Sequence, residues 1–115
     1  TKVSGQEAIA IGKESKAGKE SVVLGGQASA ANIEQAVVIG HSATASKAKS
    51  IAIGARSKST NEYGIAVGGG ATADGKNAVA VGRDSKGAGA DSIAIGNSAK
   101  TTGADSVVVG ANINV

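Results

Sequence analysis

The stretch "ADSIAIGNSAKTTGADSVVVG", residues 90 to 110, states one short phrase twice and decides the fold. In each copy a small polar segment leads into three aliphatic residues, and a glycine ends the phrase. Aligned on that glycine, the chain holds eight copies, which end at Gly12, Gly25, Gly40, Gly54, Gly68, Gly82, Gly96 and Gly110. The interval from Gly40 to Gly54 recurs in every later copy, whereas the first interval is one residue shorter and the second is one residue longer. A fixed period of this kind indicates a repeat architecture. We expect the inserted residue in the turn between Gly25 and Val37, with the register recovered after it.

Each copy alternates large, small and large residues, as in Ile93, Ala94 and Ile95. This period of two, in β-branched residues, predicts a short strand. A second, weaker alternation follows each glycine, with tiny residues on either side of a polar one, as in Ser85, Lys86 and Gly87. Two strands in about 14 residues make one coil, and stacked coils pair each strand in parallel at ~4.8 Å. The sequence therefore predicts an all-β parallel β-roll, a β-solenoid with two short strands per coil.

The side of the first strand that points outward decides which residues can contact a partner chain. We expect its large residues to face the interior, against the small side chains of the second strand. The other face then carries a flat apolar stripe, and such a stripe on a soluble protein marks an interface. The trimer-interface candidates on that stripe are Ala10, Val23, Val38, Ala52, Ala66, Ala80, Ala94 and Val108.

Composition narrows the classes of function. The chain of 115 residues suits one domain, and its 41% hydrophobic residues are mostly Ala, Val and Ile. The absence of Cys excludes disulfides and thiolate metal sites. A mild, dispersed net charge of +3 and a single aromatic residue argue against nucleic-acid binding. No apolar run is long enough to span a bilayer, so we expect no direct membrane insertion by this segment. With no initiator Met and repeat-like sequence at both ends, we expect an excised piece of a longer protein.

Nothing in the chain predicts catalysis. His41, the single histidine, follows Gly40 on an expected turn and is interpreted as solvated. The glycine-rich "VGGGATADG", residues 67 to 75, lacks the Lys-Ser/Thr of a phosphate loop and is interpreted as a turn between two strands. Tyr63 precedes Gly64, where other copies have a side chain, and we expect the ring to pack over that gap. We predict no enzyme activity, no cofactor and no metal site.

The phrases "SIAIGARS", residues 50 to 57, and "NAVAVGRDS", residues 77 to 85, resemble the head repeat of trimeric autotransporter adhesins, the YadA-like heads. The resemblance extends from about Glu7 to Ala111. It implies a left-handed roll that assembles as a homotrimer on the bacterial surface, anchored in the outer membrane through a C-terminal region missing here. It also implies virulence-related adhesion to host extracellular matrix, such as collagen or fibronectin, to host cells, or to other bacteria.

The predicted organisation is a β-roll head over residues 1–110, followed by residues 111–115 as a final-coil cap or the start of a neck, of which we favour the neck. Parallel stacking aligns Lys86 with Lys100, one coil apart. A basic surface is therefore a candidate ligand site, repeated in each subunit so that weak contacts add up. Its members are Arg56, Lys58, Arg83, Lys86 and Lys100.

Two other functions stay open. The roll could be a structural spacer that lifts another binding domain from the cell. Less favoured is an ice-binding solenoid, which needs continuous outward files of threonine. The outward threonines do not form one continuous file; they are Thr44, Thr60, Thr72, Thr101 and Thr102.

Overall fold

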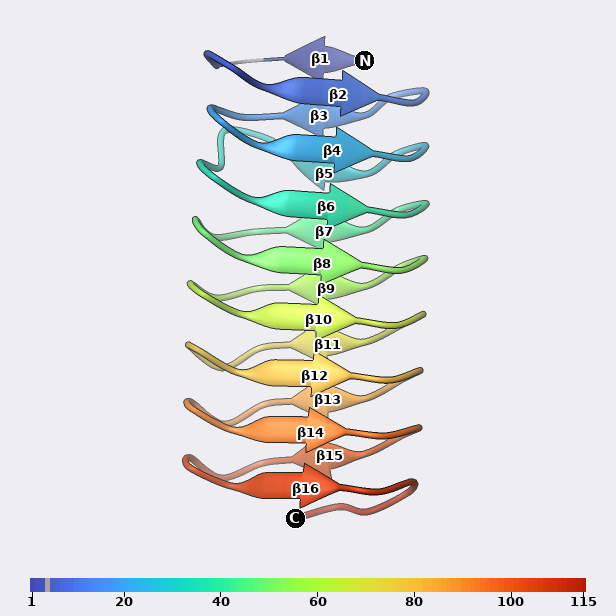
Figure 1. Ribbon diagram of the computed structural model, residues 1–115, viewed down its shortest axis with the longest axis vertical. Helices are drawn as coiled ribbons and strands as arrows, with labels where there is room; N and C mark the ends of the chain where they lie inside the picture. Colours follow the sequence, from blue (N-terminus) through green and yellow to red (C-terminus); the bar gives the residue numbers. More distant parts are fainter. Residues whose placement is uncertain (4) are drawn as a thin grey trace.

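A computed structural model describes residues 1–3 and 5–115 of the chain. Within these residues the chain winds into a flat, all-β rod of stacked coils, 39 Å long, 20 Å wide and 13 Å thick (Figure 1). Each coil contributes one strand to each of two parallel sheets. The prediction of a parallel β-solenoid with two short strands per coil is confirmed.

Sheet A contains the odd-numbered strands, which are two residues long. They are β1 (Lys2–Val3), β3 (Lys16–Ala17), β5 (Ser29–Ala30), β7 (Thr44–Ala45), β9 (Lys58–Ser59), β11 (Thr72–Ala73), β13 (Lys86–Gly87) and β15 (Lys100–Thr101). Sheet B contains the even-numbered strands, which are three residues long. They are β2 (Ile9–Ile11), β4 (Val22–Leu24), β6 (Val37–Ile39), β8 (Ile51–Ile53), β10 (Ile65–Val67), β12 (Val79–Val81), β14 (Ile93–Ile95) and β16 (Val107–Val109). In Figure 1 the strands of sheet B run to the right in front, and those of sheet A return to the left behind.

The phased glycines turn the chain from sheet B toward sheet A. Gly54 has a φ of +128°, a backbone conformation that L side chains rarely adopt. A Cβ placed on Gly54 would lie 2.6 Å from the carbonyl of Gly68 in the next coil. A positive φ and a close backbone approach are therefore both present at this column, and together they explain why it is glycine in every copy.

The predicted facing of sheet B is wrong. The middle residue of each strand points into the roll, where seven of the eight predicted interface residues are buried and Ala10 is half-buried. The largest of them, Val23 and Val38, are 0% exposed in the single chain. A side chain without exposed surface in its own chain cannot contact a sister chain. The set that the facing prediction misplaced is Ala10, Val23, Val38, Ala52, Ala66, Ala80, Ala94 and Val108.

The inversion follows from the thinness of the coil. Sheet A sends mostly small side chains inward, such as Ala71 and Ala73, and these pack against small residues of sheet B such as Ala66 and Ala80. Because so short a coil brings its two strands close together, the interior has room for alanine, serine and an occasional valine. The large aliphatic residues of sheet B must therefore lie on the outer face.

Buried serines close the turns. Ser57 Oγ donates to the Gly54 carbonyl oxygen at 2.8 Å, and Ser85 Oγ makes the equivalent bond to Gly82. Such bonds satisfy polar groups that water cannot reach. Ser59 Oγ is the exception among the described residues, because it is buried without a hydrogen-bond partner.

The expectation for Tyr63 is also wrong. Its ring is 49% exposed, with Lys49 Nζ 5.7 Å from the ring centroid, so it does not cover Gly64. The space beside Gly64 is occupied by Ser59, whose Oγ lies 2.5 Å from where a Gly64 Cβ would be. A side chain inside the roll therefore fills the gap that we had assigned to the aromatic ring outside.

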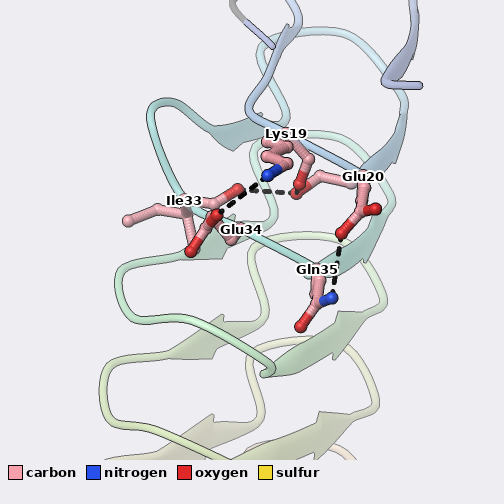
Figure 2. A network of polar contacts seen from close by, with 6 residues as sticks. Lys19, Glu20, Ile33, Glu34 and Gln35 are labelled. Atoms are coloured by element: carbon pink, nitrogen blue, oxygen red, sulfur yellow. Dashed lines mark hydrogen bonds and ion pairs between the residues drawn. The ribbon is translucent and has the colours of Figure 1, made fainter. Parts of the chain in front are cut away.

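The short and the long repeat intervals arise in neighbouring turns, and the long one lies between Gly25 and Val37 as predicted. The strand register recovers after them. Residues 18–21 join β3 to β4 and residues 31–36 join β5 to β6, whereas residues 46–50 make the ordinary turn. Polar contacts join the short turn to the long one (Figure 2). Strand β6 then pairs in register with both β4 and β8.

The serine of the short turn makes the closest of these contacts. Ser21 Oγ donates to the Ile33 carbonyl oxygen at 2.6 Å and accepts from the Ala36 N–H at 3.1 Å. Side chains outside add Gln35 Nε2 to Glu20 Oε1 at 2.9 Å. The extra residue is thus absorbed by a turn that its short neighbour holds in place.

Residues 111–115 continue the winding beyond β16. Asn114 forms a parallel bridge with Lys100, and the Val115 N–H donates to the Lys100 carbonyl oxygen at 2.9 Å. The segment therefore lies on the last strand of sheet A.

Candidate functional site

The outer face of sheet B carries two parallel files of aliphatic side chains. Because each three-residue strand turns its middle residue inward, its first and third residues both point out. The first file is Ile9, Val22, Val37, Ile51, Ile65, Val79, Ile93 and Val107. The second file is Ile11, Leu24, Ile39, Ile53, Val67, Val81, Ile95 and Val109. We call these sixteen residues the aliphatic face.

The aliphatic face is open to solvent in the single chain, most of all at its two ends. Ile11 is 63% exposed, Val107 64% and Val109 67%, whereas the residues of the central strands are half-buried. Contiguous apolar surface of this extent marks an interaction site on a soluble protein. The interface was expected on the same strands but on their opposite side. The available signal was the serine before many of these strands, whose hydroxyl belongs on the same inward side as the small middle residue.

The outer face of sheet A carries a single file of polar side chains in strict register. We call it the donor file. Its members are Lys2, Lys16, Ser29, Thr44, Lys58, Thr72, Lys86, Lys100 and Asn114. Lys86 and Lys100 are direct neighbours, as predicted. Five of these nine positions are lysine, so positive charge recurs along the axis of the rod, with neutral hydroxyl residues between the lysines in its middle part.

The structure brings together three of the five predicted ligand residues. Lys58, Lys86 and Lys100 lie in the donor file, whereas Arg56 and Arg83 lie on the turn between the sheets. Arg83 Nε is 3.6 Å from Asp84 Oδ2.

Ion pairing differs among the lysines of the file. Lys86 Nζ is 3.6 Å from Asp74 Oδ2, and the other carboxylate oxygen of Asp74 accepts from Thr60. In the part of the chain that the structure describes, the other four lysines of the file make no ion pair; they are Lys2, Lys16, Lys58 and Lys100. Their charges are therefore more available to a ligand than the charge of Lys86.

His41 and the glycine-rich segment lie where they are expected, but Thr101, expected to point outward, is buried. His41 is exposed on a turn, with Nδ1 3.2 Å from the Ser42 hydroxyl. The glycine-rich segment forms the turn between β10 and β11. Thr44 and Thr72 are separated by a lysine in the donor file, and Thr101 is buried, so no continuous outward threonine file exists among the described residues.

Residues 1–3 and 5–115 contain neither a cluster of metal ligands nor a membrane-spanning helix. No three His, Asp or Glu side chains gather as they would around a metal ion. No helix with the length and apolar character of a membrane span is found in this part of the chain either.

The repeat pattern, the coil geometry and the stacked glycines can now be compared with known proteins. The family model for the YadA head domain repeat matches residues 4–18, 34–57, 59–85 and 88–112. The chain belongs to the YadA head repeat family. The first gap in the match, residues 19–33, contains much of the irregular pair of turns, and a comparison with individual curated proteins found no match. YadA-type heads are structural, adhesin-type modules of trimeric autotransporters, and they are not known as enzymes.

Proposed function

We propose that this YadA-type head is the protomer of a homotrimer and works as a surface adhesin. The observation that carries the proposal is the aliphatic face, whose sixteen large side chains all point out of the roll and keep solvent-accessible surface in the single chain. Each side chain taken fully out of water adds roughly 1.5–3 kcal/mol, and partly buried ones add less. A row of eight coils therefore gives a strong drive for self-association.

The two files of the aliphatic face suit a closed ring of three. In such a ring every protomer presents two different surfaces, one to each neighbour. The files supply them, because the first and third residues of the strands form two separate rows along the face. Family membership supports three subunits over two. The winding seen in Figure 1, with each coil advancing downward as its front strand runs right, supports the left-handed sense expected of such heads.

The targets we propose are host matrix proteins such as collagen or fibronectin, host cells, or other bacteria. The head would be displayed at the bacterial surface, on an outer-membrane anchor outside this segment. We propose Arg56, Lys58, Arg83, Lys86 and Lys100 as contacts to the ligand, three of them in the donor file. For residues 111–115 we propose a cap on the final coil, supported by the bridge between Lys100 and Asn114, with the start of a neck as the alternative.

Cross-linking tests the assembly cleanly because the chain has no cysteine of its own. Ile53→Cys places a thiol on the aliphatic face, and Thr72→Cys places a matched thiol on the donor file. With a short bis-maleimide we expect covalent multimers from Ile53→Cys and almost none from Thr72→Cys. Equal cross-linking of both variants, or of neither, would contradict the proposed interface.

Adhesion is tested with particles coated with the protein and applied to immobilised collagen or fibronectin. The double variant Lys86→Gln/Lys100→Gln should reduce adhesion severalfold if the basic residues hold the ligand. The matched control, Lys47→Gln/Lys76→Gln, removes the same charge from two turns that lead from sheet A to sheet B, outside the donor file. Adhesion that is unchanged in the first variant would remove these residues from the proposed site.

A further inference from the structure

The donor file has a uniform chemistry that adhesion to matrix proteins does not explain. Each of its nine side chains offers a hydrogen-bond donor, as an ammonium, hydroxyl or amide group, and none is acidic or apolar. The side chains stand one above another at ~4.8 Å, the spacing of paired strands. The result is a straight track for a ligand that needs donors at regular intervals.

The track keeps like charges close together. Lys2 pairs with Lys16, and Lys86 pairs with Lys100, as direct neighbours in the sheet. Like charges opposed in this way are destabilising. Asp74 offsets the charge of Lys86, but among the described residues no ion pair offsets Lys2, Lys16 or Lys100. An anionic partner laid along the file would relieve this repulsion.

Acidic residues beside the track are already engaged. Asp74 accepts from Thr60 and pairs with Lys86, Asp84 pairs with Arg83, and Glu14 accepts from Gln27 Nε2 at 3.2 Å. Their partners hold them at the border, so they leave the centre of the file positive.

The end of the track near β1 is also hollowed. A cavity of about 360 Å³ is lined by Lys2, Lys16 and Ser29, but also by Glu14, whose carboxylate disfavours an anion there. A second cavity of about 190 Å³ lies between the same two lysines and Asn32, one of the two left-handed residues of the long turn. No acidic residue lines this second cavity, so it gives one anionic group of a longer ligand a place beside the stacked ammonium groups.

We infer that the donor file binds a linear sulfated polysaccharide, lying parallel to the axis of the rod. The file offers charge and hydrogen-bond donors without an aromatic or apolar anchor, so a densely anionic chain matches it more fully than a protein surface does. Single-stranded nucleic acid would need aromatic platforms for its bases, and these are missing from the file too. A polysaccharide with several sulfates in each disaccharide matches the stacked pairs of lysines better than a polysaccharide with a single carboxylate in each disaccharide. This inference deepens the proposed adhesin function, on which it rests, by naming a class of ligand.

The test uses size-defined heparin oligosaccharides, titrated into the purified protein by calorimetry at several salt concentrations. We expect binding that weakens with salt with a log–log slope of about −3.5, from ~0.7 for each of five lysines by analogy with single-stranded polyanions. Lys58→Gln/Lys100→Gln should weaken binding at least tenfold and flatten the slope by about 1.4. The matched control Lys47→Gln/Lys76→Gln should stay within about twofold of the parent protein.

Several outcomes would overturn the inference. These are absence of heparin binding at low salt, equal losses in the two double variants, and equally tight binding of hyaluronan, which carries carboxylates alone. Binding of oligodeoxythymidine at least as tight as that of heparin would also overturn it. Because adhesion to collagen and fibronectin is measured separately, a protein that adheres to them but ignores heparin contradicts this inference and leaves the adhesin function intact. Heparin binding by a protein that forms no cross-linked multimers and does not adhere to matrix proteins would support this inference and contradict the proposed adhesin function.

Discussion

The pair Ser59 and Gly64 offers the sharpest test of how this thin interior is packed. Ser59 is 0% exposed, and its Oγ has no hydrogen-bond partner among the described residues. A Cβ on Gly64 would meet that oxygen at 2.5 Å, although the φ of Gly64 is not positive. One coil later the equivalent positions are Ala73 and Ala78, both buried. The chain therefore already contains the pairing that a double substitution at 59 and 64 would create.

We predict opposite effects of the two single substitutions. Ser59→Ala removes a buried hydroxyl that costs about 1–3 kcal/mol when unpaired, so after the small lost contact it should raise the free energy of unfolding by ~1 kcal/mol. Gly64→Ala alone overpacks the interior and should lower it by about 1–3 kcal/mol. In the double variant the added methyl fits and restricts the unfolded chain, which is worth ~0.4–1 kcal/mol. The double variant should therefore equal or exceed the parent protein, with a coupling energy of at least ~1 kcal/mol.

The assay is urea unfolding followed by far-UV circular dichroism, at one fixed protomer concentration because association shifts apparent stability. Ser57→Ala is the matched control, since its Oγ donates to the Gly54 carbonyl at 2.8 Å. Its loss should cost about 0.5–1.5 kcal/mol, the opposite sign to Ser59→Ala. The reasoning is refuted if Ser59→Ala destabilises as Ser57→Ala does, or if the effects at 59 and 64 simply add.

Two further substitutions test the turns, both by the same urea unfolding. Gly68 has a φ of +135°, and a Cβ there would lie 2.6 Å from the Gly82 backbone, so Gly68→Ala should lower the free energy of unfolding by about 1–3 kcal/mol from strain alone. A Cβ on Gly69 would have its nearest neighbour at 3.9 Å, so Gly69→Ala should change stability little. Equal effects of the two substitutions would contradict the stacked-glycine explanation. Ser21→Ala removes the hydroxyl between the Ile33 carbonyl and the Ala36 N–H and should cost about 1–3 kcal/mol, and a neutral result would show that this hydroxyl is not what joins the two irregular turns.

Much of this architecture could be predicted from the spacing of the sequence. The glycine period indicated the coil, and the alternation around Ile93 and Ile95 indicated the strand, because both depend on local backbone geometry. The recovery of register after residues 31–36 also followed, since two compensating intervals keep later coils aligned.

The facing of the strands could not be predicted from alternation, because a period of two is the same for either side. Our inference assumed that large side chains belong in the core, as in most globular proteins. In this roll the short distance between the two sheets decides which side chains fit inside. Ala66 and Val23 fit in the interior, but the isoleucines beside them do not. The environment of Gly64 was missed for a related reason: Ser59 reaches it across the interior, a contact invisible to a comparison of copies. The donor file was partly predicted through Lys86 and Lys100, but its continuity through Thr72 required the observed register.

The central claim is that the aliphatic face is covered by sister chains in a threefold assembly. Native mass measurement tests it most directly, with the parent protein at dilute, physiological-salt conditions beside an Ile65→Lys variant on the aliphatic face. The account predicts three times the protomer mass of 10.9 kDa for the parent, and smaller species for the variant. A folded parent protein that persists at 10.9 kDa on dilution would contradict it.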